Sequence, residues 1–173
     1  FPTRRSSDLG IILVPCGERP ESLEKIDEQT PIVLIDRYFE DTSLSYICTD
    51  NYRGALDGVK LLIENGHKEI LCIRGVPHSM PSKERVKGYI DALRESGFDT
   101  RSRITGNDYS ITNGYLETKL AIGSPARPTA IFALSNTIML GAIRAIGESS
   151  LRIPDDVSIL SFDNNLFRSE ERR

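Results

Sequence analysis

The sequence predicts an α/β fold in which parallel strands are covered by helices. Short apolar runs, such as GIILVP at 10–15 and EILCIR at 69–74, are bounded by proline, glycine or charged residues, as buried strands are. Between these runs lie segments with apolar residues at helical spacing, several of which end at a glycine, as helices often do. Alternating strands and helices require β–α crossovers and therefore a parallel sheet.

The first part of the chain predicts three strands and one short helix. Residues 10–15 and 31–36 (PIVLID) are expected to be buried strands. The polar segment 20–29 between them carries Leu23 and Ile26 on one face, which favours a helix. Residues 45–49 (SYICT) are expected to form the third strand.

From residue 51 onward, helices and strands alternate regularly. The segment 51–65 carries one apolar stripe, which includes Ala55, Val59 and Leu62, and a glycine follows it. The other elements expected here are strands at 69–74, 103–105, 129–134 and 157–162, and helices at 82–96, 112–122 and 137–146.

Composition excludes several classes of protein. The chain has 173 residues, of which 39% are hydrophobic and 27% charged, and its formal net charge is −3. That apolar content argues against disorder. No apolar run approaches the ~20 residues of a membrane-spanning helix, so no membrane partner is expected. The acidic balance argues against nucleic-acid binding by this stretch itself.

Cysteines and histidines predict neither a metal site nor a cofactor. The three cysteines form no C-x-x-C pair, and His67 and His78 complete no familiar ligand spacing with them. Cys48 and Cys72 lie in apolar runs, so both are expected to be buried, reduced thiols. Reduced thiols suit a cytoplasmic protein.

Common catalytic patterns are absent from the sequence. It contains no GxGxxG, no GxxxxGK[ST], no GxSxG and no HExxH. There is no marked nucleophile and no second histidine near His78, so no catalytic residue is assigned. The sequence therefore favours a binding protein over an enzyme.

Polar residues follow most of the predicted strands, where parallel sheets bind ligands. Their carboxylates, amides and guanidinium groups suit hydrogen bonds to a sugar, a nucleoside or a similar metabolite. Alternatively, each residue only caps a strand or helix, and Asn51 and Asn136 are most open to that reading because they precede predicted helices. The residues are Asp36, Arg37, Asp50, Asn51, Arg74, Gly75, Ser135, Asn136, Asp163 and Asn164.

Four motifs make the chain resemble the LacI/GalR family of lactose-repressor-type transcriptional regulators. They occur in the family's order and extend over residues 9–166. The motifs are Asp50-Asn51 with Gly54 and Gly66-His67, then Ser82-x-x-Arg85-x-x-Gly88-Tyr89 with Ala92-Leu93, then PTAIF at 128–132 with Gly141-Ala142, and finally IPDDVSILSFD at 153–163.

This resemblance implies a periplasmic-binding-protein-like fold with two α/β lobes and an effector bound between them. Residues 9–49 would belong to an incomplete first lobe and residues 50–167 to the second. The implied function is effector sensing, in which a small polar metabolite modulates DNA binding by an N-terminal helix-turn-helix that this stretch lacks. The implied partners are therefore the effector and operator DNA, and the complete protein would be a cytoplasmic homodimer.

The resemblance also implies ligand-binding residues. Arg85 matches the arginine of the family's R-x-x-G-[YF] motif, a principal effector contact, and its planar fork suits paired hydroxyls or a carboxylate. Asp163 matches an acceptor for ligand hydroxyls, and Asp36 is a weaker counterpart in the first lobe. Tyr109 matches a position where an aromatic ring often stacks on the ligand. The alternatives are an exposed arginine at a helix start and a tyrosine that anchors its loop.

One expected site position departs from the family pattern. Where the family commonly reads Asn-Asp, this chain has Ser135-Asn136. Both residues are still expected at the site, but the balance of donors and acceptors differs there. Effector identity therefore does not carry over from a sugar-binding relative.

Both ends of the chain follow no helix or strand period. Residues 1–8 (FPTRRSSD) and 168–173 (RSEERR) are therefore expected to be non-native or disordered. An incomplete first lobe would expose sheet edges. The chain is accordingly expected to be less stable than a complete region and prone to association.

Two other functions stay open on the sequence alone. A periplasmic-type sugar-binding protein of a transport system shares the fold and the strand-end site. The IPDDVSILSFD run and the reduced cysteines favour the regulator. A doubly wound enzyme acting on a nucleotide or sugar is disfavoured by the missing phosphate loop and nucleophile. An upstream helix-turn-helix or signal peptide would separate the first two.

Overall fold

The computed structural model describes residues 10–15, 23–98 and 103–163, which belong to two compact units. The first unit ends at Asp50 and the second begins at Asn51. Each unit has its own parallel sheet and its own hydrophobic core. The two expected ends, 1–8 and 168–173, lie outside the described residues, as do Cys16 and Asn164.

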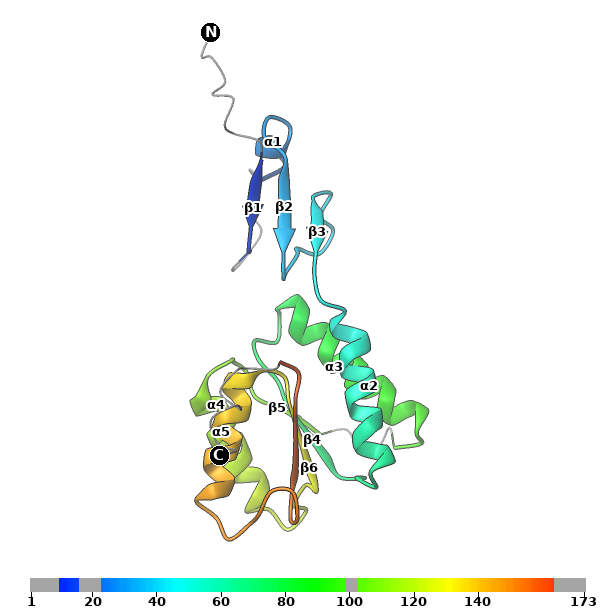
Figure 1. Ribbon diagram of the computed structural model, residues 1–173, viewed down its shortest axis with the longest axis vertical. Helices are drawn as coiled ribbons and strands as arrows, with labels where there is room; N and C mark the ends of the chain where they lie inside the picture. Colours follow the sequence, from blue (N-terminus) through cyan, green and yellow to red (C-terminus); the bar gives the residue numbers. More distant parts are fainter. Residues whose placement is uncertain (1–9, 16–22, 99–102, 164–173) are drawn as a thin grey trace, which may run out of the picture. The chain divides into compact units, whose positions relative to one another are not determined.

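The first unit is a three-stranded parallel sheet with one short helix (Figure 1). Strand β2 is central and pairs with β1 on one side and β3 on the other. Four buried side chains form its core: Leu23, Ile32, Leu34 and Leu44. The elements are β1 (Ile11–Leu13), α1 (Leu23–Asp27), β2 (Ile32–Ile35) and β3 (Ser45–Ile47).

Burial in this unit corrects two expectations from the sequence. The 10–15 run was expected to be a buried strand, yet Ile12 in β1 is 74% exposed. Cys48 was expected to be buried and is only half-buried, whereas Cys72 is buried and reduced as expected. An apolar strand is buried only when other elements cover it, and β1 lies at the sheet edge beside a single helix of five residues.

The second unit is a four-stranded parallel sheet with strand order β5-β4-β6-β7. The predicted parallel α/β fold class is therefore confirmed. Each helix and strand lies within two or three residues of its expected range. The strands are β4 (Ile70–Ile73), β5 (Arg103–Thr105), β6 (Ala130–Ala133) and β7 (Ser158–Ser161), and the helices are α2 (Asn51–Glu64), α3 (Met80–Glu95), α4 (Ile111–Ile122) and α5 (Asn136–Gly147).

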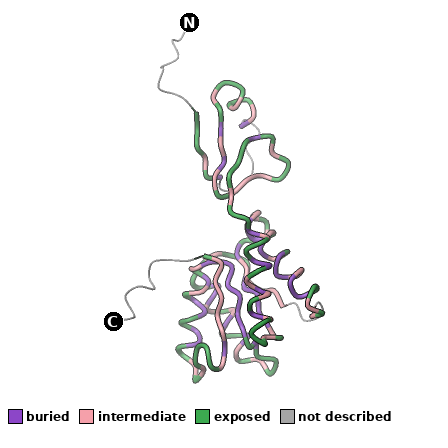
Figure 2. The backbone as a smooth tube through the Cα atoms, turned by 45° about the vertical axis from the view of Figure 1, so that its right-hand side comes forward, coloured by how far each residue is buried: buried purple, intermediate pink, exposed green. Residues whose placement is uncertain are grey.

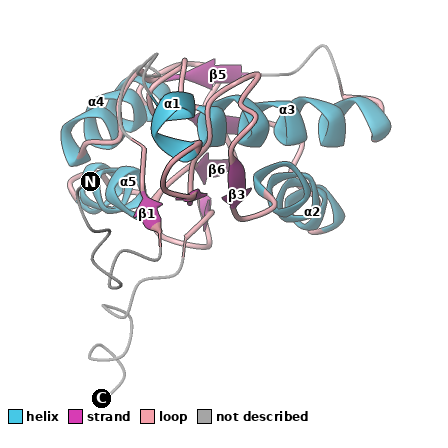
Figure 3. Cartoon of the chain, turned by 90° about the horizontal axis from the view of Figure 1, so that it is seen from above, coloured by secondary structure: helices cyan, strands magenta, loops and turns pink. Residues whose placement is uncertain are grey.

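Helices cover both faces of this sheet, with α2 and α3 on one face and α4 and α5 on the other (Figures 1 and 3). The side chains of β4 divide accordingly. Ile70 and Cys72 pack with α2 and α3, whereas Leu71 and Ile73 pack with α4 and α5. Figure 2 shows the resulting buried positions along the central strands and on the inner sides of the helices.

Helices α4 and α5 approach each other closely because glycines face the neighbouring backbone. A Cβ atom at Gly114 would lie 2.1 Å from the carbonyl oxygen of Ile138, and one at Gly141 would lie 2.1 Å from that of Ile111. Both helices begin at a serine whose hydroxyl accepts a backbone N–H: Ser110 from Asn113 at 3.0 Å and Ser135 from Ile138 at 3.4 Å. Caps of this kind fix where a helix starts.

Within the described part of the chain, no helix is long and apolar enough to span a membrane.

Candidate ligand-binding site

The polar residues of the second unit gather where its strands end. Because all four strands are parallel, their carboxyl ends share one edge of the sheet. Helices α3, α4 and α5 begin after β4, β5 and β6, so their N-termini lie toward this edge and add positive dipole ends to it. The predicted site residues Arg85, Tyr109, Ser135, Asn136 and Asp163 all belong to this unit.

Arg85 is the best-anchored side chain of the site. Its Nε donates to Oδ1 of Asn51 at 2.8 Å, and its Nη1 donates to the carbonyl oxygen of Leu134 at 2.5 Å. The guanidinium carbon lies 3.7 Å from the ring centroid of Phe162. Arg85 is only 8% exposed, so it is not the exposed helix-start arginine of the alternative reading.

The sequence of α3 explains why this arginine is buried. Tyr89, Ala92 and Leu93 of the same helix face the core. Arg85 lies one turn before Tyr89 and therefore continues the buried stripe of the helix. A buried guanidinium is stable only with several hydrogen-bond partners, which Asn51 and Leu134 supply from two other elements.

Asp163 lies beside Arg85 at the end of β7. Oδ1 of Asp163 is 3.9 Å from Nη2 of Arg85, which makes an ion pair that is too long for a direct hydrogen bond. The side chain of Asp163 is 45% exposed, so its carboxylate reaches solvent at the sheet edge. The structure thus brings together the two residues to which the resemblance assigned the principal polar contacts.

Ser135 and Asn136 are held by neighbouring side chains at the start of α5. Ser135 caps this helix, and its hydroxyl lies 3.0 Å from Oγ1 of Thr137. Oδ1 of Asn136 accepts a hydrogen bond from the hydroxyl of Ser161 in β7 at 3.3 Å. The capping alternative therefore holds for Ser135. Asn136, which begins α5 shortly after β6, is joined by its hydrogen bond to the end of β7.

Tyr109 is fixed at both its backbone and its side chain. Its carbonyl accepts a hydrogen bond from the hydroxyl of Thr137, and its own hydroxyl lies 3.0 Å from Oγ of Ser79. Its ring lies against the backbone of Gly75, where a Cβ atom would be 2.1 Å from Cε1 of Tyr109. These contacts fit the alternative of a loop-anchoring tyrosine, and the role of the ring in stacking stays a prediction.

Asp36 belongs to the first unit, at the end of β2. Its backbone is left-handed, with φ of 69°, a conformation that aspartate adopts more readily than most residues. Its carboxylate lies 3.5 Å from Nε of Arg37 and is 55% exposed. This residue is therefore solvent-accessible at a strand end.

Three further residues build the site without having been assigned to it. Asn51 was considered only as a strand-end residue or cap, and Phe162 only as part of a motif. Asn113 holds the loop before α4: its amide donates to the carbonyls of Arg74 at 3.1 Å and Asp108 at 2.6 Å. Only its position three residues after the serine cap marks Asn113 in the sequence.

Among the residues that the structure describes, no group of three or more histidine, cysteine, aspartate or glutamate side chains is arranged to hold a metal ion.

A parallel α/β unit with a polar, solvent-reaching site at its strand ends defines a ligand-binding protein of the periplasmic-binding-protein type. The comparisons with known proteins agree. Residues 59–170 match the family of periplasmic binding protein-like domains. The chain is 35% identical over 156 residues to the transcriptional repressor PurR of Actinobacillus pleuropneumoniae, and 34% identical over 145 residues to the repressor CytR of Escherichia coli.

Solved structures give the same result. A putative LacI transcriptional regulator from Bacillus cereus aligns with a TM-score of 0.79 at 32% identity, covering 91% of this chain and 57% of its own. A putative ribose operon repressor from Burkholderia thailandensis aligns with a TM-score of 0.76 at 31% identity, covering 90% of this chain and 58% of its own. The chain belongs to the LacI/GalR family of transcriptional regulators and corresponds to their effector-binding region.

The relatives also bear on the competing functions. PurR and CytR are transcriptional repressors, which favours a regulator over an enzyme or a transport receptor. The matches cover 88% and 83% of this chain but only 46% and 42% of those proteins. The chain thus spans less than half the length of these relatives.

Proposed function

We propose that this chain senses a small polar metabolite, a sugar or nucleoside-like molecule, on behalf of a DNA-binding repressor. The metabolite binds at the strand ends of the second unit, where Arg85 and Asp163 are its principal polar contacts. Effector binding shifts the population of lobe arrangements and so changes the operator affinity of an N-terminal helix-turn-helix. The complete protein acts in the cytoplasm as a homodimer.

The observation that carries this proposal is the Arg85–Asp163 pair. Asn51, Leu134 and Phe162 hold the guanidinium in one orientation, so little conformational freedom is lost when a ligand binds it. The 3.9 Å separation leaves the pair without a direct hydrogen bond. A ligand hydroxyl could accept a hydrogen bond from Arg85 and donate one to Asp163 at the same time.

The neighbouring residues support a neutral, hydroxyl-rich ligand. Ser135, Thr137 and Asn136 present hydroxyl and amide groups near the start of α5, and Tyr109 places an aromatic ring in the adjoining loop. Hydroxyls and amides both donate and accept hydrogen bonds, as sugar and nucleoside hydroxyls do. An aromatic face suits the C–H face of a sugar or the plane of a base.

The test begins with a thermal-shift screen of monosaccharides and nucleosides against the chain. For the best compound, we expect Asp163→Asn to weaken binding by about tenfold to a hundredfold, the loss of one hydrogen bond to a charged group. Arg85→Ala in the complete repressor should abolish the effector response while operator binding persists. The measurements are calorimetric titration and operator-binding assays.

Arg144→Ala is the matched control because it removes an exposed arginine from the outer side of α5. It should leave effector affinity unchanged. Unchanged affinity in Asp163→Asn, with the fold intact by circular dichroism, would refute the assignment of the site. Turnover of the bound compound would instead favour an enzyme.

A further inference from the structure

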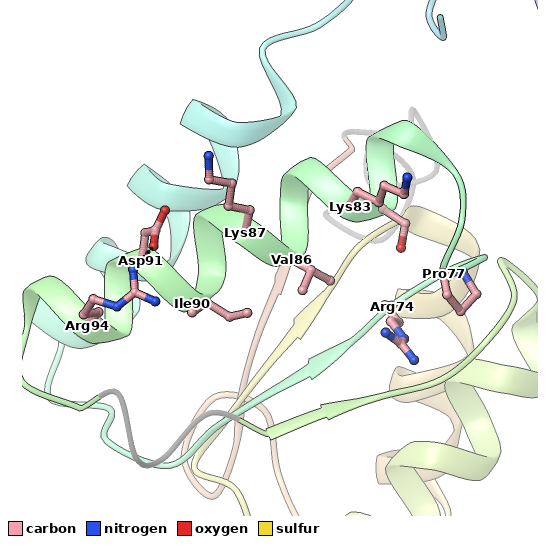
Figure 4. A pocket seen from close by; sticks show the side chains of 9 residues that line it. Arg74, Pro77, Lys83, Val86, Lys87, Ile90, Asp91 and Arg94 are labelled. Atoms are coloured by element: carbon pink, nitrogen blue, oxygen red, sulfur yellow. Dashed lines mark hydrogen bonds and ion pairs between the residues drawn. The ribbon is translucent and has the colours of Figure 1, made fainter. Parts of the chain in front are cut away.

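A concave surface of the second unit lies along α3, apart from the Arg85–Asp163 pair. It is an open groove of about 440 Å³ between α3 and the end of β4, and none of Arg85, Ser135, Asn136 and Asp163 lines it (Figure 4). The proposed effector site therefore does not account for this groove.

The groove is lined by four cationic side chains and one carboxylate, although the chain as a whole carries a net charge of −3. The carboxylate, Asp91, pairs with Arg94 at 2.6 Å. Arg74 uses its Nε to bind the carbonyl of Gly106 at 3.0 Å, which leaves its two terminal nitrogens as further donors. The remaining cations are Lys83 and Lys87. This concentration of positive charge favours an anion.

An apolar strip runs beside these charges. Figure 4 shows the side chains of Val86 and Ile90 on the side of α3 that faces Arg74. Both residues are only half-buried and line the groove. An apolar strip next to a cationic end is typical of a site for an organic anion rather than a bare ion.

Ser82 provides an independent indication of a ligand. This residue is 1% exposed and lines the groove, yet its Oγ has no hydrogen-bond partner within the described residues. Buried hydroxyls are nearly always paired, because an unpaired one loses its hydrogen bonds to water without replacement. A ligand oxygen in the groove would supply the missing partner.

We propose that this groove binds a small organic phosphate. Its phosphate accepts hydrogen bonds from the Ser82 hydroxyl and the Arg74 guanidinium, since a guanidinium fork matches phosphate oxygens. The organic part lies along Val86 and Ile90. The inference goes beyond the proposed effector site, because it assigns a second ligand to the groove along α3.

Phenyl phosphate is the probe, titrated into the 15N-labelled chain and followed by backbone amide NMR. We expect saturable shifts at Gly75 and along residues 82–90, with a dissociation constant of about 1 mM or below. Inorganic phosphate should bind the same residues more weakly, and phenol should bind more weakly still. Ser82→Ala and Lys87→Gln should each weaken the binding of phenyl phosphate several-fold, and Arg74→Gln should weaken it about tenfold.

Arg144→Gln is the charge-matched control and should bind phenyl phosphate as the unchanged chain does. Ser82→Ala removes only an unpartnered hydroxyl, so its melting temperature should not fall. If Arg144→Gln weakened phenyl phosphate binding as much as Arg74→Gln does, the binding would be unspecific charge attraction, and the proposal would be overturned. Shifts centred on residues 134–137 and 163, or no saturation by phenyl phosphate, would overturn it as well.

Discussion

Tyr89 is a single residue that connects three elements of the second unit. Its ring is fully buried in α3, and its hydroxyl donates to the carbonyl of Ile70 at 2.8 Å and accepts the N–H of Arg103 at 2.9 Å. Ile70 begins β4 and Arg103 begins β5, so the hydroxyl ties the starts of two strands to the helix that covers them. Burial raises the pKa of Tyr89 and that of the neighbouring Cys72 thiol, so both stay uncharged.

At the residue scale, we expect Tyr89→Phe to lower the free energy of unfolding by about 1–3 kcal/mol, because the buried carbonyl of Ile70 and the half-buried N–H of Arg103 both lose a hydrogen-bond partner. Urea unfolding followed by circular dichroism measures this. Tyr52→Phe is a fitting control, since its hydroxyl donates to the side chain of Asp91 in a half-buried position. Equal effects of the two variants would contradict the role given to Tyr89.

At the scale of elements, the α4–α5 pair depends on two small residues and a surface ion cluster. Gly114 and Gly141 allow the helix backbones to approach. Across the outer side, Glu148 accepts hydrogen bonds from Tyr115 at 2.6 Å and from Lys119 and Arg144 at 3.2 Å. These hydrogen bonds lower the pKa of Glu148 to about 2, so the carboxylate stays charged at neutral pH.

Gly141→Ala should destabilise the chain by about 1–3 kcal/mol, because a methyl group there overlaps the backbone of α4 and forces the helices apart. In Gly147→Ala, at the end of the same helix, the added methyl group would meet no atom of the described residues within 4 Å. This control should be neutral or should stabilise by up to about 1 kcal/mol, the helix preference of alanine over glycine. Thermal unfolding measures both, and a Gly141→Ala variant as stable as Gly147→Ala would refute the close packing.

At the scale of the whole molecule, the two units differ in how much apolar surface they bury. The first unit buries four core side chains, whereas the second has two clusters, one on each face of its sheet. Exposed apolar side chains occur in both units, with Ile12 at 74% and Leu120 at 73% exposure. The expectation that the chain self-associates stays a prediction.

We expect the proposed homodimer to use α4 and α5, where Leu116, Leu120, Leu140 and Ile143 are exposed. Leu120→Glu should weaken self-association at least about tenfold, since burying one leucine contributes about 1.5–3 kcal/mol. Sedimentation equilibrium measures this, and Leu61→Glu on the exposed side of α2 serves as the control. If Ile12→Glu abolished association and Leu120→Glu did not, the sheet of the first unit would be the contact surface.

The order of strands and helices follows from the sequence because apolar spacing and glycine ends are local properties. Arg85 and Asp163 were expected as ligand contacts only because their motifs resemble those of the LacI/GalR family, and that role stays a prediction. The exposure of β1 and the partial exposure of Cys48 could not be predicted, because the burial of a strand depends on which other elements cover it. Asn51 was expected only as one of the polar residues at strand ends, and its hydrogen bond to Arg85, 34 residues away, was not predicted. Asn113 was missed, since its partner Arg74 lies 39 residues away in the chain.

The sequence by itself determined the parallel α/β class, the family and the residue types at the strand ends. Only the tertiary structure decided that Arg85 is buried and oriented by Asn51, Leu134 and Phe162. It also decided that Ser82 lines a cationic groove with no hydrogen-bond partner among the residues that the structure describes. The physical reason is that hydrogen bonding and burial depend on atoms from distant segments. A sequence pattern shows which chemical groups are available, and tertiary packing decides which of these groups come into contact.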